Sequence, residues 1–268
     1  MDIGYGWDTG LIRKLNEDSI FFTSFEIKTH LGTASAGLFA VADGMGGHNA
    51  GEVASNLAVK TFFAECLAGL LEQEPPPPLS IISDAFNRAN NSVIEAAGDR
   101  DLQGMGTTLT AALVIDHDMY MAHIGDSRCY IINTRETLQV TRDHSVVQHL
   151  VDAGKITQVE ARSHPRRNEI TRVLGYSGDS TPDLIQVKLY AGDNILICSD
   201  GLCGVLPQEK ITQAVLNSPG PSQACAELTA EANLAGGPDN ISVIIARPVN
   251  LPSWQALTAA KTSIRTAS

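Results

Sequence analysis

The chain has 268 residues, of which 43% are hydrophobic and 18% charged, a balance typical of a globular protein with a substantial core. Its formal net charge of −11 argues against nucleic acid and anionic membrane surfaces as main partners, because those ligands select basic patches. The five cysteines include no Cys-x-x-Cys pair, so the sequence predicts neither a disulfide framework nor a structural zinc site.

The sequence also lacks the usual signals of export and of membrane insertion. Residues 1–18 contain no apolar segment of the kind found in secretory signal peptides. No run of about 18 apolar residues occurs along the chain. We therefore expect a cytoplasmic protein that does not associate with membranes.

The first expected elements are a buried strand over residues 38–42 and two helices that follow it. In the first helix, residues 51–71, apolar side chains recur every four residues at Ala54, Ala58, Phe62 and Cys66. A similar spacing predicts a second helix over residues 79–97. Four consecutive prolines at residues 75–78 separate the two helices, because proline interrupts a continuous helix.

The rest of the chain is rich in apolar, β-branched segments that predict strands. These segments are residues 108–115, 119–124, 128–133, 184–190, 194–199 and 240–248. Residues 116–118 and 191–193 are interpreted as hairpin turns, which favours antiparallel sheets. Shorter helices are expected at residues 145–153 and 222–235, and His123 inside a strand is expected to be a packed core residue.

The segment LFAVADGMGGHNAGEVA, residues 38–54, allows two interpretations at the end of its strand. One is a phosphate-binding loop, but the dinucleotide fingerprint requires glycine where Asn49 stands. The other nucleotide-loop pattern requires a lysine, and the next lysine is Lys60. The alternative is that Asp43 is part of a metal site.

Four aspartates stand at the ends of strongly apolar strands: Asp43, Asp126, Asp200 and Asp239. A single aspartate beside glycine is ordinarily a turn residue. Converging carboxylates, however, would repel one another and raise each other's pKa unless a cation neutralised them. Ligands made of oxygen atoms favour Mg²⁺ or Mn²⁺ over zinc.

Eight motifs, four of which contain these acids, occur in a fixed order along the chain. They are RKLNED (13–18), VADGMGGH (41–48), GMGTT (104–108), HIGDSR (123–128), TRDHS (141–145), HPRRNEITRVLG (164–175), CSDGL (198–202) and GGPDNISVI (236–244). The series resembles the bacterial branch of the metal-dependent type 2C protein serine/threonine phosphatases over about residues 3–247. The resemblance implies an α+β fold, a four-layer αββα sandwich of two packed antiparallel sheets flanked by helices. It also implies a catalytic domain over residues 1–248, with residues 249–268 as a C-terminal tail.

The resemblance further implies a centre of two tightly held Mn²⁺ or Mg²⁺ ions. Matched by motif, Asp43 bridges both ions and the Gly44 carbonyl binds one of them. Asp200 and Asp239 bind the other ion.

Further residues surround this implied centre. Glu17 and Asp18 are expected to hold water molecules on the metals, and Arg13 to bind the substrate phosphate. Asp126, with Asp200, is expected to hold a weaker third ion. Arginine suits phosphate because its planar guanidinium can bind two oxygens at once.

The chain departs from many eukaryotic members at Met45, where they carry a histidine proposed as general acid. Methionine cannot transfer a proton, so another group or water must protonate the leaving oxygen. His48 is our hypothesis for that catalytic group.

Residues 143–175 correspond to a flap beside the site in this family. They carry a cluster of arginines at positions 162, 166, 167 and 172. This cluster either contacts phosphoprotein substrates or belongs to an exposed, solvated loop.

The favoured function is hydrolysis of phosphoserine and phosphothreonine in proteins, by water activated at the binuclear centre. The alternatives are a catalytically silent phosphoprotein-binding regulator of the same fold and a hydrolase of small phosphate esters. The expected partners are phosphorylated proteins, including a cognate serine/threonine kinase or its targets, and the chain is expected to be a monomer.

Overall fold

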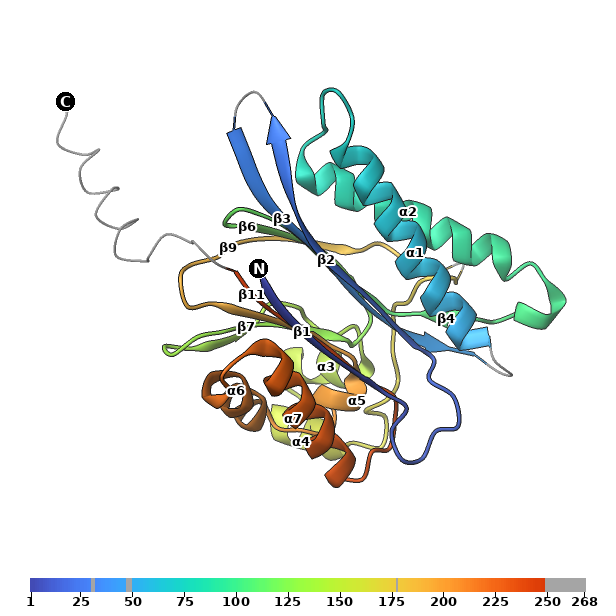
Figure 1. Ribbon diagram of the computed structural model, residues 1–268. Coiled ribbons are helices and arrows are strands. Elements are labelled where there is room, and N and C mark those ends of the chain that lie inside the picture. Colours follow the sequence, from blue (N-terminus) through green and yellow to red (C-terminus); the bar gives the residue numbers. More distant parts are fainter. Residues whose placement is uncertain (30–31, 47–49, 177, 249–268) are drawn as a thin grey trace.

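The computed structural model describes residues 1–29, 32–46, 50–176 and 178–248, and shows two packed antiparallel sheets with helices on their outer faces (Figure 1). This arrangement confirms the predicted αββα fold class. The tail expected at residues 249–268 lies outside the described residues.

The first sheet contains both the N-terminal strand and the last strand of the described chain. Its order is β1 (Asp2–Asp8), β11 (Ile241–Arg247), β10 (Asn194–Cys198), β7 (Arg128–Ile132) and β8 (Thr137–Gln139). Each neighbouring pair is antiparallel. Strands far apart in sequence therefore lie side by side.

The second sheet is built mainly from the first half of the chain. Its order is β2 (Asp18–Thr29), β3 (Gly32–Met45), β5 (Leu109–Ile115), β6 (Asp118–Ile124) and β9 (Asp183–Lys188). The short β4 (Gly106–Thr107) pairs with the end of β3. In β2 and β3, Asp18 and Asp43 are directly opposite each other.

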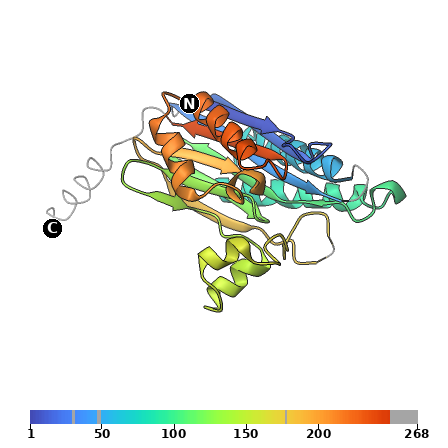
Figure 2. The same cartoon turned by 90° about the horizontal axis from the view of Figure 1, so that it is seen from below.

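Helices cover the outer face of each sheet. The second sheet is covered by α1 (Ala50–Leu70) and α2 (Pro78–Ala96), and a short 3₁₀ turn, η1 (Arg100–Leu102), follows them. The first sheet is covered by α5 (Asp200–Cys203), α6 (Gln208–Asn217) and α7 (Pro221–Leu234). Two further helices, α3 (Val146–Asp152) and α4 (Gln158–Ser163), project from the sandwich, as Figure 2 shows in yellow-green.

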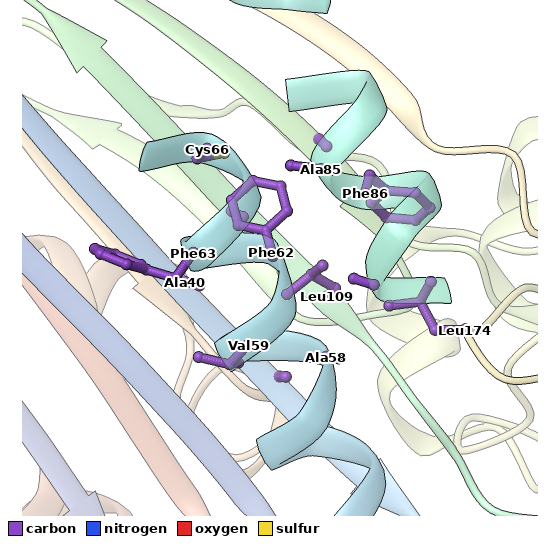
Figure 3. Packing of buried hydrophobic residues seen from close by; sticks show 14 of the residues in the cluster. Ala40, Ala58, Val59, Phe62, Phe63, Cys66, Ala85, Phe86, Leu109 and Leu174 are labelled. Atoms are coloured by element: carbon purple, nitrogen blue, oxygen red, sulfur yellow. The ribbon is translucent and has the colours of Figure 1, made fainter. Parts of the chain in front are cut away.

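Three apolar clusters hold these layers together. Beneath α1 and α2, Phe62, Phe86 and Leu109 pack in a single buried cluster (Figure 3). A second cluster fills the space under α6 and α7. The third lies between the two sheets and includes Phe39 and Met121.

Helix α1 is long and apolar enough, by length and composition, to cross a membrane, and it is the one such helix in the part of the chain described here. The expectation based on uninterrupted apolar runs did not identify it. Its side chains Ala58, Phe62 and Cys66 are fully buried against the sheet and α2, and this position in the core accounts for its composition (Figure 3).

One predicted hairpin is confirmed and the other is wrong. Between β5 and β6, Ile115 pairs with Asp118, and Asp116 adopts the left-handed conformation that a tight turn requires. Residues 191–193, in contrast, connect β9 to β10, which belong to different sheets. This turn carries the chain across the sandwich, and Asn133, directly after β7 of the first sheet, donates a hydrogen bond of 2.8 Å to its Asp193.

Candidate metal centre

The acidic side chains meet where strands of both sheets end at one edge of the sandwich. Asp18 and Asp43 come from paired positions of β2 and β3. Asp200 follows β10, and Asp239 precedes β11, its partner in the first sheet. Asp43 interacts electrostatically with Asp18, Asp200, Asp126 and Asp239, in that order of strength. The structure therefore brings together carboxylates from near both ends of the sequence.

Burial and mutual repulsion make four of the carboxylates, those of Asp18, Asp43, Asp126 and Asp200, unusually hard to ionise. Burial, followed by the charges of the neighbouring aspartates, raises the pKa of Asp43 well above its usual value. Burial likewise raises the pKa of Asp126 and Asp200. For Asp18, burial raises the pKa to about 8, although Ser199 donates a hydrogen bond of 2.8 Å to its Oδ2.

The main chain around Asp43 is fixed by two threonines. The Asp43 N–H donates to Thr108 Oγ1 at 2.9 Å, and its carbonyl accepts from the Thr108 N–H and from Thr107 Oγ1 at the same distance. The following residue must be glycine, because a Cβ at Gly44 would lie 2.1 Å from the carbonyl oxygen of Gly51. The glycine at the strand end thus lets α1 begin directly against the site.

Asn240 organises the N-terminal side of the site, a role that sequence reasoning missed. Its Oδ1 accepts from the Glu17 N–H at 2.8 Å, and its Nδ2 donates to the carbonyls of Thr9 and Leu15 at 2.9 Å each. The residue stands inside the motif GGPDNISVI, directly after Asp239. Motif position was therefore the available signal for it.

Arg13 is half-exposed and lies on the rim of the acidic cluster. Its Nη2 is 2.8 Å from Asp239 Oδ2 and its Nη1 is 3.9 Å from Glu17 Oε2, with 47% of its side chain exposed. The hydrogen bond to Asp239 is the largest contribution that raises its pKa. The guanidinium is thus a permanent cation beside the carboxylates, with donors still open to solvent.

Asp126 is buried at the bottom of the same region. It follows Gly125, whose φ of 108° is in the left-handed region, and a Cβ there would lie 2.4 Å from the Thr108 side chain. Nearby, Arg128 binds Asp143 through two nitrogens, with Nη2 2.7 Å from Oδ2. That pairing leaves Asp126 without a partner from Arg128.

As the side chains stand, the described residues contain no group of three or more His, Cys, Asp or Glu side chains arranged to hold a metal ion. The Asp43 and Asp200 side chains lie close enough to influence each other's pKa. Oδ1 atoms of Asp18, Asp126 and Asp200 are nevertheless buried without a hydrogen-bond partner among the described residues. Buried oxygens of this kind are costly unless something binds them, so the donor set fits a hard divalent cation.

Two sequence predictions fall elsewhere. His48 lies outside the described residues. Arg172, expected in an exposed basic cluster, is 20% exposed and binds Asp183 Oδ1 at 3.0 Å. Arg172 therefore lies at the base of the flap, where it is bound to strand β9 through Asp183.

A cleft of about 780 Å³ leads from the acidic cluster along the flap. One end is lined by Arg13, Asp126, Asp200 and Asp239. The flap wall contributes Gln148, Val159, Arg162 and Arg167, and the opposite wall is formed by residues 200–209. Its volume is larger than a phosphate group needs and is in the range of sites that bind sizeable ligands.

The comparisons with known proteins agree with this arrangement. The sequence pattern described as protein phosphatase 2C matches residues 15–232. The chain is 43% identical over 245 residues to the serine/threonine protein phosphatase PstP of Mycobacterium tuberculosis, covering 91% of this chain but 44% of that protein. It thus spans less than half the length of this mycobacterial relative.

Two further matches extend over most of both chains. The chain is 36% identical to the serine/threonine phosphatase stp of Listeria monocytogenes over 241 residues, 89% of this chain and 92% of that protein. The crystal structure of the PstP catalytic domain in complex with two manganese ions superposes with a TM-score of 0.75 and 38% identity, covering 91% and 96% of the two chains. The resemblance inferred from the motifs is confirmed: the chain belongs to the protein phosphatase 2C family.

Proposed function

We propose that the chain is a metal-dependent protein serine/threonine phosphatase that hydrolyses phosphoserine and phosphothreonine. The observation that carries the proposal is the meeting of buried, unpartnered carboxylate oxygens with Arg13 at one end of a cleft. The relatives named above as serine/threonine phosphatases, and the PstP structure with two manganese ions, support it.

In this proposal the metal ligands are those implied by the motifs. Asp43, the Gly44 carbonyl, Asp200 and Asp239 would hold two Mn²⁺ or Mg²⁺ ions. When bound, such ions neutralise the carboxylates, polarise phosphoryl oxygens and lower the pKa of water toward about 7. The unpartnered oxygen of Asp200 supports its place in this set.

A second group of acids completes the proposed site. Glu17 and Asp18 would act through water molecules, and Asp126 would hold a weaker third ion with Asp200. The electrostatic interaction between Asp126 and Asp200 supports the last assignment. After burial, the charge of Asp200 is the strongest influence that raises the pKa of Asp126.

The protein's own groups bind and orient the phosphate. Arg13 would release Asp239 in part and direct its open donors toward two phosphate oxygens. The strands hold Asp43 rigidly through Thr107 and Thr108, so the phosphate meets a fixed set of charges. The proton for the leaving oxygen stays assigned by hypothesis to His48 or to water, because Met45 cannot supply it.

The two alternative functions are less well supported. A catalytically silent regulator is disfavoured because Asp43, Asp200 and Asp239 are all present and Asp43 interacts electrostatically with the other two. A hydrolase of small phosphate esters would use the same acids. The volume of the cleft, about 780 Å³, favours a substrate larger than a small ester.

The decisive experiment is hydrolysis of p-nitrophenyl phosphate by chelator-treated protein, with and without added Mn²⁺. We expect Mn²⁺ to restore activity in the native chain but not in Asp200→Asn, which lacks a proposed ligand. Circular dichroism of both proteins shows whether they are folded. Inactivity of folded native protein with Mn²⁺ would refute the enzymatic proposal.

We also propose that the flap wall of the cleft recognises acidic side chains that flank the phosphorylated residue. Arg162 and Arg167 are exposed, line the cleft, and form no ion pair within 4.0 Å among the described residues. Arg166, on the same segment, is instead paired with Glu169 at 2.7 Å. The arginines that face the cleft are therefore available for a negatively charged partner.

Charge reversal at Arg162 and Arg167 is expected to lower kcat/KM for an acidic phosphothreonine peptide by about 3- to 10-fold, because exposed ion pairs contribute about 0.2–1 kcal/mol each. The loss is expected to be smaller for a matched neutral phosphopeptide. Arg166→Glu is the control, since this arginine does not line the cleft. Equal losses for acidic and neutral peptides would contradict the assignment.

We infer the remaining properties from the same reasoning. Phosphorylated proteins, including a cognate serine/threonine kinase or its targets, would be the substrates. The catalytic domain would span residues 1–248, act as a monomer and be cytoplasmic, with residues 249–268 as a tail. The fold supports the domain boundary, because β11 ends at Arg247 and pairs with the first strand.

A further inference from the structure

His144 lies where three separate segments of the chain meet. It is 5% exposed and stands at the start of the flap. Its main-chain N–H donates to the Gly125 carbonyl at 2.7 Å, and its own carbonyl accepts from Thr171, at the far end of the flap, at 2.8 Å. A β-bridge between Ser145 and Ile170 closes the flap immediately beyond it. The base of the flap is therefore tied to the loop that carries Asp126.

The imidazole of His144 adds a second bond to the same glycine. The Gly125 N–H donates to Nδ1 at 3.1 Å, so this nitrogen must be the unprotonated acceptor. Nε2 then carries the proton and donates to Asp183 Oδ2 at 3.1 Å. Both polar groups of Gly125 are thus held by one residue, the carbonyl by the His144 main chain and the N–H by its side chain.

The surroundings fix the ring in that orientation. Asp183 accepts from His144 through Oδ2 and from Arg172 through Oδ1, so one carboxylate holds both side chains. Arg172 Nη1 lies 2.7 Å from His144 Nε2, and the carboxylate offsets the proximity of these two donors. On its other side the ring packs against the ring of His123 at 4.9 Å between centroids. Burial lowers the pKa of His144, in keeping with a neutral ring.

Gly125 needs such a hold because Asp126 comes directly after it. The backbone of Gly125 is in the left-handed region and sits against Thr108. Asp126 Oδ1 is buried without a hydrogen-bond partner, so no contact of that oxygen fixes the carboxylate's direction. The residues on both sides of Asp126 are held in place. The Ser127 carbonyl accepts a hydrogen bond of 3.3 Å from the Thr110 hydroxyl, and the Gly125 N–H donates to His144.

We propose that His144 is a positioning residue that holds Gly125 through Nδ1 and so directs the Asp126 carboxylate toward a third metal ion. This inference rests on the proposed function, in which Asp126 is a ligand of that ion. It also links the ion to the flap, since Asp183 and Arg172 orient the same ring. Outer-sphere partners of this type change metal affinity by about 10- to 100-fold when removed.

Substitutions can test the roles of the two ring nitrogens one at a time. The amide oxygen of asparagine is as many bonds from Cα as Nδ1, and the amide of glutamine matches Nε2. His144→Asn therefore keeps an acceptor for the Gly125 N–H and loses the contact with Asp183. His144→Gln does the reverse. Asp183→Asn weakens the hold on Nε2 while leaving the imidazole in place.

The experiment measures Mn²⁺ binding to the full chain by calorimetry and exchange of the Gly125 amide by NMR in chelator-treated protein. We expect the native chain to bind a weak third ion that Asp126→Asn loses. His144→Gln should weaken that ion by about 10-fold and speed exchange of the Gly125 amide. His144→Asn should stay closer to the native chain in both measurements, and Asp183→Asn should lie between them.

Several results would overturn the proposal. Equal losses in His144→Asn and His144→Gln would mean that the ring acts by packing alone. Faster amide exchange in His144→Gln with unchanged binding of the third ion would show that the hold on Gly125 does not affect metal binding. A native chain that binds two ions and hydrolyses p-nitrophenyl phosphate would refute the third ion while leaving the proposed function intact.

Discussion

Asp43→Asn is expected to lower Mn²⁺-dependent hydrolysis of p-nitrophenyl phosphate by more than about 100-fold, because changes at outer-sphere partners alone cost about 10- to 100-fold in metal sites. The same substitution is expected to stabilise the chelator-treated protein. Asp43 is partly buried among four other aspartates, so a neutral amide of similar shape removes the cost of either protonating this carboxyl or desolvating its charge beside the others. Activity assays and urea unfolding of the same preparations measure the two effects.

This prediction is specific because the substitution should lower activity and at the same time raise the stability of the metal-free protein. Asp84→Asn, an exposed substitution on α2, is the control and should change neither quantity. A variant that is inactive and also less stable without metal would contradict the view that these carboxylates are held together against their repulsion.

The second large effect is a reversal of pH dependence by metal. Asp18 has its pKa raised from 3.8 to about 8 by burial, and Asp43 is shifted in the same direction. A raised folded-state pKa means that the folded chain retains a proton that the unfolded chain has lost. The stability of chelator-treated protein should therefore fall as the pH rises toward about 8, by up to about 1.4 kcal/mol per pH unit for each such carboxyl.

The useful window is pH 6.5 to about 8. Below it, His123 has the opposite effect, because burial lowers its pKa from 6.5 to about 3 and stability then rises with pH. With saturating Mn²⁺ the slope should change sign, since the metal competes with protons for the carboxylates. Urea unfolding at several pH values, with chelator or with Mn²⁺, tests this. A positive slope in both conditions would exclude the protonated carboxyl cluster.

The sequence predicted strands well where they are buried on both faces. Strands β5, β10 and β11 are nearly continuous apolar runs and their positions were found within two residues, whereas only the apolar centre of β3, residues 38–42 of Gly32–Met45, was predicted. The edge strand β1 was missed, because DIGYGWD carries two glycines and exposed Tyr5 and Trp7. Its glycines have a tertiary reason: a Cβ at Gly4 would lie 2.3 Å from the main chain of Pro221.

Connections between strands were harder to predict than the strands. A short Ala-Gly-Asp turn is compatible with a hairpin and with a crossing between sheets, and local sequence does not distinguish them. The choice here depends on a distant residue, Asn133, which follows β7 and donates a hydrogen bond to Asp193.

The acids of the site could be proposed from sequence because they follow apolar strands and match motifs. Residues that orient them could not, since their roles depend on contacts across the fold. Ser199 binds Asp18 from 181 positions away, and Asn240 holds Glu17 across 223 positions. Arg172 was grouped with exposed arginines for the same reason: nothing local indicates its bond to Asp183.

The division of the acids between two sheets has a mechanical consequence. Asp18 and Asp43 move with one sheet, whereas Asp200 and Asp239 move with the other. The cluster between the sheets, which includes Phe39, is therefore a spacer whose thickness sets how far apart the two halves of the site stand. A substitution that changes side-chain volume in that layer would change the distance between carboxylates that it does not contact. The geometry of the ion-binding site therefore depends on how the two sheets pack.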